Sequence, residues 1–259
     1  ISQESSYSNQ DLRNGFGFQK YLTTPVLLVL ILLLATALRF YDLASESYWI
    51  DEIYTVIESQ QSIHQLLTSG RLDQPPAYYL PFYVWIRVFG TDEVSTRSFS
   101  ALTGIGSIIL IYLIGQELFG KTVGLLSAFI MTISAFQIYF SQESRYYIYF
   151  EFMALLSFLF FILAFRRKRI IYFVLYVVAS ILMVYSHAFG IFILAAQILF
   201  ILLQAKNFRE LMVTWLICEA LILLALIPYF SPLIFGASVS ESIMTQGSRT
   251  FPVPSLREL

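Results

Sequence analysis

Apolar runs of about 20 residues dominate the chain and are separated by short polar turns. An α-helix crosses the hydrocarbon core of a bilayer in about 20 residues, so each run has the length of a transmembrane span. We therefore predict an all-α fold, a polytopic transmembrane helical bundle of about seven spans. The predicted spans are Tyr21–Phe40, Ser98–Gln116, Thr122–Phe140, Tyr147–Phe165, Ile170–Tyr185, Phe189–Gln204 and Leu211–Phe230.

One further apolar stretch, Ala77–Phe89, differs from these runs. It has about thirteen residues, contains Pro81 and carries Arg87, so it is too short to span the bilayer comfortably. We predict that it is a juxtamembrane or re-entrant helix at the membrane interface. Counting it as a span would place the basic cluster Arg166–Arg169 outside the cell, against the positive-inside rule.

With seven spans, the basic loops all fall on one side of the membrane, which is then cytoplasmic. These loops carry Arg13, Lys20, Lys121, Arg166–Arg169, Lys206 and Arg209. The opposite side receives a long loop, residues 41–97, which is rich in Asp and Glu, together with the turns at 141–146 and 186–190. The polar islands of the chain are therefore predicted to meet on the non-cytoplasmic face.

This topology divides the chain into three parts. Residues 1–20 form a cytoplasmic N-terminal segment, residues 21–230 form the transmembrane domain with its outer catalytic loop 41–97, and residues 231–259 form an outer-face tail. The chain begins with Ile1 rather than Met and stops shortly after a predicted span. We therefore expect it to be part of a longer protein, with the tail leading to a missing C-terminal part.

Composition supports an integral membrane protein. Hydrophobic residues make up 58% of the chain and charged residues 13%, against about 45–50% and about 25% in soluble domains. The formal net charge of −1 provides no basic stripe to neutralise phosphates, which argues against a nucleic-acid partner. The aromatic content of 17% exceeds the need of a plain bundle, and some of it is expected to line a lipid or carbohydrate groove. The single cysteine, Cys218, is expected to be a buried packing residue.

The most informative polar island is Trp49-Ile50-Asp51-Glu52, directly after the first predicted span. Neighbouring residues on a helix point about 100° apart, so only one of the two carboxylates can face a given pocket. Long outer loops commonly carry function. The alternative is a solvated acidic loop without a catalytic role.

A second island, Gln142-Glu143-Ser144-Arg145-Tyr146, interrupts the apolar sequence between two spans. The planar fork of an arginine matches phosphate oxygens, so Arg145 is a candidate ligand of a lipid phosphate. Pairing between Glu143 and Arg145 is the structural alternative. His187 is expected at the same level, although a lone histidine is more often structural than catalytic.

Tyr78 and Tyr79 follow the segment Asp73-Gln74-Pro75-Pro76, which predicts an extended entry into a helix. Their hydroxyls and ring faces are expected at the membrane interface. They can serve there in a substrate groove or simply as part of an aromatic belt.

The islands occur in the order found in the GT-C membrane glycosyltransferases. The chain resembles most the branch that contains protein O-mannosyltransferases and the aminoarabinose transferase of lipid A, over about Arg39 to Gln204. The motifs are Trp49-Ile50-Asp51-Glu52, Gln74-Pro75-Pro76-Ala77-Tyr78-Tyr79, Phe89-Gly90 with Arg97, Ser141 to Tyr146, and His187-Ala188-Phe189-Gly190. It departs from the usual pattern at Gln74, where a histidine is common, and at Ala188, where a tyrosine is common.

This resemblance implies transfer of a sugar, with inversion, from a polyprenyl-phosphate donor to a hydroxyl-bearing acceptor on a protein, lipid or glycan, at the outer membrane face. It gives Asp51 the role of general base. The candidate catalytic residues are Asp51, Glu52 and Glu143. The candidate donor-binding residues are Gln142, Arg145, Tyr146, His187, Tyr78, Tyr79 and Arg97. No metal or other cofactor is required by default, although Glu143 could join Asp51 at a divalent ion. Membrane lipid is a further expected partner.

Two other functions fit an apolar chain of this kind. A transporter or flippase for lipids or sugar-lipids would place ionisable residues near mid-membrane, where Glu151 and Glu219 are the acidic candidates. A non-catalytic GT-C-like membrane subunit would bind the lipid-linked sugar without transferring it. The clustering of charge at the predicted outer edge favours surface chemistry over a translocation path.

Overall fold

The computed structural model describes the backbone of residues 23–68 and 75–235, and the side chains of residues 23–66 and 75–230. Within these ranges every regular element is a helix, which confirms the predicted all-α class. The predicted segment 1–20, the motif residues Asp73 and Gln74, and most of the tail 231–259 lie outside the described residues. α11 continues to Phe235, five residues past the end expected for the last span.

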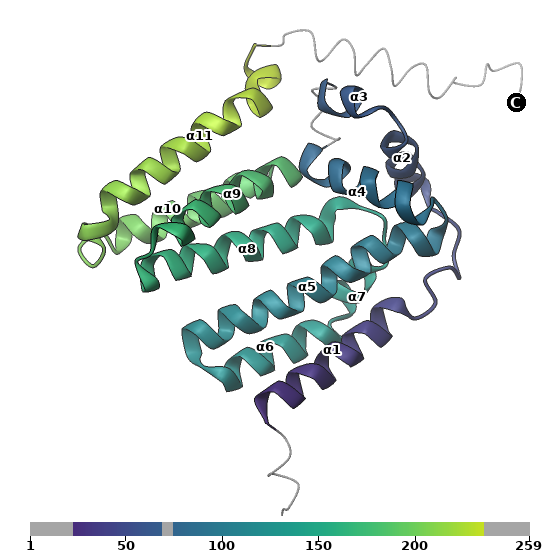
Figure 1. Ribbon diagram of the computed structural model, residues 1–259, viewed down its shortest axis with the longest axis horizontal. Coiled ribbons are helices and arrows are strands. Elements are labelled where there is room, and N and C mark those ends of the chain that lie inside the picture. The colour runs from purple at the N-terminus through teal and green to yellow at the C-terminus, as the bar shows by residue number, and fades with distance from the viewer. Residues whose placement is uncertain (1–22, 69–74, 236–259) are drawn as a thin grey trace, which may run out of the picture.

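Within the described residues the bundle is made of eight apolar helices, most of which run roughly along a common direction, while α7 turns away from α6 (Figure 1). They are α1 (Thr24–Phe40), α5 (Glu93–Phe119), α6 (Lys121–Ile133), α7 (Ala135–Ser141), α8 (Tyr146–Arg167), α9 (Ile170–Ser186), α10 (Gly190–Leu203) and α11 (Met212–Phe235), the last preceded by the short 3₁₀ helix Arg209–Leu211. Among the described residues, three helices are long and apolar enough to cross a membrane alone, and the number is four if the bent pair α6–α7 is one span. α1, α9 and α10 are apolar but shorter. The molecule is an integral membrane protein, and its seven spans stay a prediction.

The predicted third span, Thr122–Phe140, is wrong as one continuous helix. It is broken at Ser134 into α6 and α7, with a bend of 64°. A break leaves the last carbonyls of the first helix without partners, and these must be satisfied elsewhere. Arg39, at the end of α1, is fully buried and donates to the carbonyls of Thr132 and Met131, each at 3.3 Å. A side chain from another helix thus stabilises the bend.

Three short helices lie at one end of the bundle: α2 (Ile50–Ser59), α3 (Ile63–Thr68) and α4 (Pro76–Phe89) (Figure 1). α4 corresponds to the stretch predicted to be juxtamembrane. One of its faces is exposed, at Val84 and Val88. The opposite face packs into a buried aromatic cluster, so Tyr78 and Tyr79 are core residues at 0% and 1% exposure, not members of an interfacial belt.

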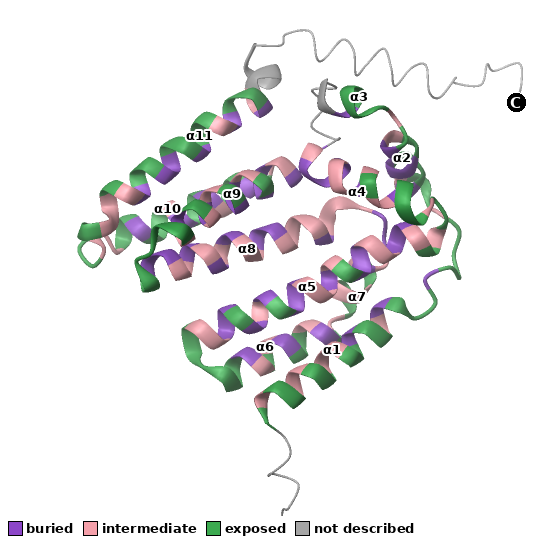
Figure 2. Cartoon of the chain, in the orientation of Figure 1, coloured by how far each residue is buried: buried purple, intermediate pink, exposed green. Residues whose placement is uncertain are grey.

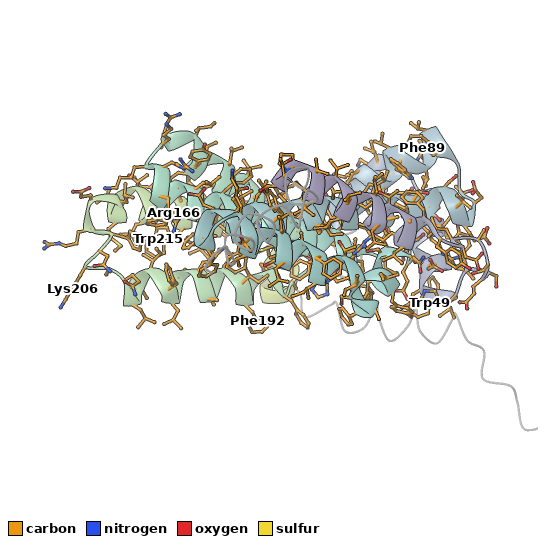
Figure 3. The ribbon with its side chains drawn as sticks, turned by 90° about the horizontal axis from the view of Figure 1, so that it is seen from below. Trp49, Phe89, Arg166, Phe192, Lys206 and Trp215 are labelled. Carbon is orange, nitrogen blue, oxygen red and sulfur yellow. The ribbon has the colours of Figure 1, made fainter. Side chains whose placement is uncertain are left out.

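The two ends of the bundle differ in charge. Arg166 and Lys206 lie at the end opposite to Trp49 and Phe89 (Figure 3). Exposed apolar side chains cover much of the surface between the ends, particularly on α1 and α11 (Figure 2). An exposed apolar surface of this extent is expected for helices in contact with lipid. Both acidic islands lie at the end that carries α2, α3 and α4, as the alternation of the spans predicts.

Candidate active site

The site is formed where the N-terminus of α2 meets the turn between α7 and α8. Glu52, in the first turn of α2, reaches back to the backbone N–H of Trp49 in a capping-box arrangement. The same carboxylate accepts the backbone N–H of Ser144 at 2.8 Å. One buried side chain therefore joins two segments that are 92 residues apart in the chain.

Glu52 is fully buried and forms a bidentate ion pair with Arg97 of α5. The Arg97 Nε donates to Oε1 at 2.9 Å and Nη2 donates to Oε2 at 2.7 Å. Arg97 also donates to the carbonyls of Leu43 and Glu46, at 2.6 and 2.8 Å. Both residues were sequence candidates for chemistry or phosphate binding. The structure places them in a saturated network beneath the site, where they hold the outer loop.

Asp51 is more open. Its side chain is 39% exposed, and its Oδ2 lies 3.8 Å from Nη2 of Arg145, which is 12% exposed. Arg145 is anchored by Nη1, which donates to the hydroxyl of Thr55 at 2.9 Å and to the backbone carbonyl of Asp51 at 3.2 Å. The Nε of Arg145 is buried and has no hydrogen-bond partner within the described part of the chain. The pair thus combines an accessible carboxylate, that of Asp51, with the guanidinium of Arg145, whose Nε–H is an unused hydrogen-bond donor among the described residues.

Glu143 lines a cavity of about 350 Å³ next to this pair. The carboxyl group is buried, and burial raises the pKa of Glu143 above its usual range, against a hydrogen bond from Tyr139 that lowers it. Its Oε2 has no hydrogen-bond partner in residues 23–66 and 75–230. The other lining residues are Trp49, Phe136, Tyr139, Phe140, Tyr147, Ile148 and Glu151.

Tyr146 and His187 form an aromatic wall beside Arg145. The guanidinium lies 4.7 Å from the centre of the Tyr146 ring, in cation–π contact, and the His187 ring lies 5.4 Å from that of Tyr146. Nδ1 of His187 accepts the backbone N–H of Phe189 at 3.1 Å. Burial lowers the pKa of His187, so the neutral imidazole with its proton on Nε2 is favoured at neutral pH.

The remaining residues that the sequence suggested, Gln142, Tyr78 and Tyr79, contact the elements that surround the site. The side-chain amide of Gln142 donates to the carbonyl of Tyr41 at 2.9 Å, and so ties the turn to the segment that follows α1. Tyr79 donates to Glu58 at 2.9 Å, and the hydroxyl of Tyr78 is buried without a partner. Thus Asp51, Glu143, Arg145, Tyr146 and His187 gather at the site, while Gln142, Tyr78 and Tyr79 contact its frame.

Three contributors were missed at the sequence level. Thr55 supports Arg145 and lies one helical turn after Asp51, which is the spacing that could have indicated it. Tyr139 and Tyr147 flank the Glu143–Arg145 turn, and aromatic residues beside a polar turn are a weaker signal. Glu151 was considered for a transport path, and it lines the same cavity as Glu143 instead.

Among residues 23–66 and 75–230, no group of three or more His, Cys, Asp or Glu side chains is placed to hold a metal ion. Whether the site uses a metal stays a prediction. The arrangement can do two things chemically. An exposed carboxylate can accept a proton, and a half-free guanidinium can hold an anion next to it.

The structure is a helical membrane bundle with a carboxylate, an arginine and an aromatic-lined cavity gathered at one end. Comparison with known sequences identifies the family. The sequence model of the dolichyl-phosphate-mannose-protein mannosyltransferase family matches residues 73–233, more than half of the chain, and the chain belongs to this family. The match begins after α2, so Asp51 and Glu52 lie outside it.

Two curated relatives are similar to parts of the chain. A protein of Aquifex aeolicus (strain VF5) described as uncharacterized is 28% identical over 193 residues, which cover 71% of this chain and 39% of that protein. The Bacillus subtilis (strain 168) protein named "Putative mannosyltransferase YkcB" is 30% identical over 115 residues, 41% of this chain and 16% of that protein. The chain thus spans less than half the length of either relative.

Proposed function

We propose that the protein transfers a sugar from a polyprenyl-phosphate carrier to an acceptor hydroxyl, with inversion at the anomeric carbon, at the non-cytoplasmic end of a multi-pass bundle. The observation that carries the proposal is the 3.8 Å approach of the Asp51 carboxylate and the Arg145 guanidinium beside a cavity, in a chain of this family.

Asp51 acts as the general base. Its exposed carboxylate accepts the proton of the acceptor hydroxyl while the hydroxyl oxygen forms a bond to the anomeric carbon. An alcohol is a weak nucleophile at neutral pH, and a positioned base accelerates such a step by about 10²–10⁴-fold. The bond between the anomeric carbon and the phosphate oxygen breaks on the opposite side of the ring, which inverts the configuration.

Arg145 holds the phosphate of the donor. Charge builds up on the departing phosphate oxygen, and a guanidinium in a partly buried setting stabilises it more than water-exposed cations do. The Nε donor, which no described residue accepts from, and the cation–π contact with Tyr146 support this role. The polyprenyl phosphate leaves as an anion, so no general acid is required.

Glu52 and Arg97 act as positioning residues. Their saturated ion pair holds Ser144 and the start of α2 in place, and this sets the position of Asp51 relative to Arg145. Tyr146 packs against the guanidinium of Arg145, and His187 packs against Tyr146. The fully hydrogen-bonded state of the Glu52 carboxylate supports this division of roles between two adjacent acidic residues.

The test is the variant Asp51→Asn in the full chain, assayed for transfer from a polyprenyl-phosphate mannose donor in membranes. We expect transfer to fall by about 10²–10⁴-fold while donor binding is retained, because only the base is removed. Glu46→Gln is the matched control, since Glu46 is an exposed carboxylate of the same loop. Equal activity of Asp51→Asn and the control would exclude the assignment.

A further inference from the structure

The cavity between α7 and α8 is the least explained feature of the outer end. Its volume of about 350 Å³ lies within the usual range of small-molecule sites, about 300–1,000 Å³. Two carboxylates, Glu143 and Glu151, reach it from the turn and from α8. Neither forms an ion pair within residues 23–66 and 75–230.

Each of these carboxylates has an unused oxygen. Oε2 of Glu143 and Oε1 of Glu151 are buried and have no hydrogen-bond partner among the residues that the structure describes. The second oxygen of Glu151 is held by the side-chain amide of Gln137, which donates at 2.7 Å. Buried acceptors without partners are costly, at about 1–3 kcal/mol each. They therefore indicate a ligand that supplies several hydrogen-bond donors.

The rest of the lining limits what that ligand can be. Trp49, Phe136, Phe140 and Tyr147 provide ring surfaces, which suit the C–H faces of a sugar ring while its hydroxyl edges donate to the carboxylates. A metal ion would gain little from aromatic walls and only two carboxylates. A lipid tail would leave both carboxylates unpaired.

The cavity adjoins the proposed reaction centre. Trp49 precedes Asp51 by two residues, and the centre of the Tyr147 ring, also in the lining, lies 5.6 Å from the guanidinium of Arg145. A sugar in the cavity would therefore carry its phosphate toward Arg145 and its anomeric carbon toward Asp51.

We propose that this cavity is the subsite for the donor's sugar ring, and that Glu151, held in place by Gln137, is a specificity-determining residue that reads the sugar's hydroxyl groups. The inference rests on the proposed function and extends it to residues that neither the family match nor the sequence motifs assign. Glu151 contacts the sugar without taking part in the transfer of the proton.

The experiment measures equilibrium binding of two probes to the full chain in lipid nanodiscs: polyprenyl-phosphate mannose and the same polyprenyl phosphate without a sugar. The variant is Glu151→Gln, which keeps the shape and removes the charge. The matched control is Glu219→Gln, because Glu219 is also a buried carboxyl on a bundle helix but accepts from Tyr176 at 2.7 Å, away from the cavity.

We expect Glu151→Gln to weaken binding of the mannose-bearing probe by about tenfold to a hundredfold, the loss typical of a hydrogen bond to a charged group, and to leave the sugarless probe unchanged. Glu219→Gln should change neither. Gln137→Leu, which frees Glu151, is a second variant and should shift the same ratio in the same direction. Equal weakening of both probes, no weakening of either, or displacement of the mannose probe by millimolar Mg²⁺ would overturn the proposal.

Arg145→Met separates this inference from the proposed function. It should weaken both probes, because both carry the phosphate. If Arg145→Met has no effect, the phosphate assignment fails, while the sugar subsite is still decided by the ratio of the two probes in Glu151→Gln. If Glu151→Gln leaves that ratio unchanged while Arg145→Met weakens both, only the subsite is rejected.

Discussion

Two ion pairs start from adjacent residues of α2 and differ in almost every respect. Glu52 and Arg97 are 1% and 8% exposed at their side chains and share two short hydrogen bonds. Asp51 and Arg145 are 39% and 12% exposed and approach only to 3.8 Å. The turn of the helix sends one carboxylate inward and leaves its neighbour at the surface of the site.

The difference shows how two adjacent acidic residues can have different roles, Glu52 a structural one and Asp51 a functional one. The inner pair is saturated, and removing one of its partners would leave a buried charge without compensation. The outer pair is long and partly solvated, so its separation costs little and Arg145 can turn toward a phosphate. Because the Glu52–Arg97 pair fixes the start of α2, the Asp51–Arg145 pair can stay weakly bonded while Asp51 keeps its position.

Glu52→Gln gives the largest expected effect. The variant leaves the Arg97 guanidinium buried opposite a neutral amide, and we expect the free energy of unfolding to fall by about 3–5 kcal/mol. Denaturant titration of the full chain in detergent micelles measures it. The comparison with the outer pair is made by Asp51→Asn, which should cost less than about 1 kcal/mol. Similar losses for the two variants would mean that the two pairs are not distinct.

Much of this arrangement could be anticipated from the sequence. The length of the apolar runs predicted the bundle helices, and the alternation of spans predicted that the Asp51 and Arg145 islands share one end. These features depend on local composition and on whether an even or an odd number of spans separates two loops. Both can be read from the sequence.

What could not be anticipated depends on partners that are distant in the sequence. Nothing near Glu52 indicates that Arg97, 45 residues later, takes up its carboxylate. The break at Ser134 carries no proline or glycine, and it depends on Arg39 of another helix, which supplies donors to the freed carbonyls. Tyr78 and Tyr79 look like belt residues until α5 and α8 are packed over them.

The pH dependence of stability provides a second, smaller effect. Burial raises the pKa of Glu143 above the ordinary glutamate value of 4.5, and the nearby carboxylate of Glu52 raises it further. The hydrogen bond with Tyr139 and the charges of Arg145 and Arg97 lower it. Between 4.5 and the raised pKa, the folded protein binds more protons than the unfolded chain. Its contribution to stability is therefore complete at low pH and is lost as the pH rises through the raised pKa.

Glu143→Gln should remove this slope. Unfolding midpoints of the variant and the unaltered chain are compared from pH 4.5 upward. The two curves should converge at acid pH, where Glu143 is protonated, and the variant should be the more stable one at neutral pH. Curves that diverge toward acid pH would instead show that Glu143 is stabilised as a carboxylate, in the manner of Glu52.

Thr55→Val tests the Asp51–Arg145 pair, and its expected effect is the smallest of those considered. The Thr55 hydroxyl donates to the backbone carbonyl of Asp51 at 2.9 Å and accepts from Arg145 at 2.9 Å. Valine keeps the shape and removes only this support, so donor affinity should fall by about fivefold, equivalent to about 1 kcal/mol, while stability changes little. Thr132→Val is the control, because its hydroxyl makes the same bond to the carbonyl four residues earlier, at 2.8 Å, away from the site. If both variants alter affinity alike, or neither does, Arg145 does not depend on the Thr55 hydroxyl for its position, and the bond from Arg145 to the Asp51 carbonyl is its main anchor on α2.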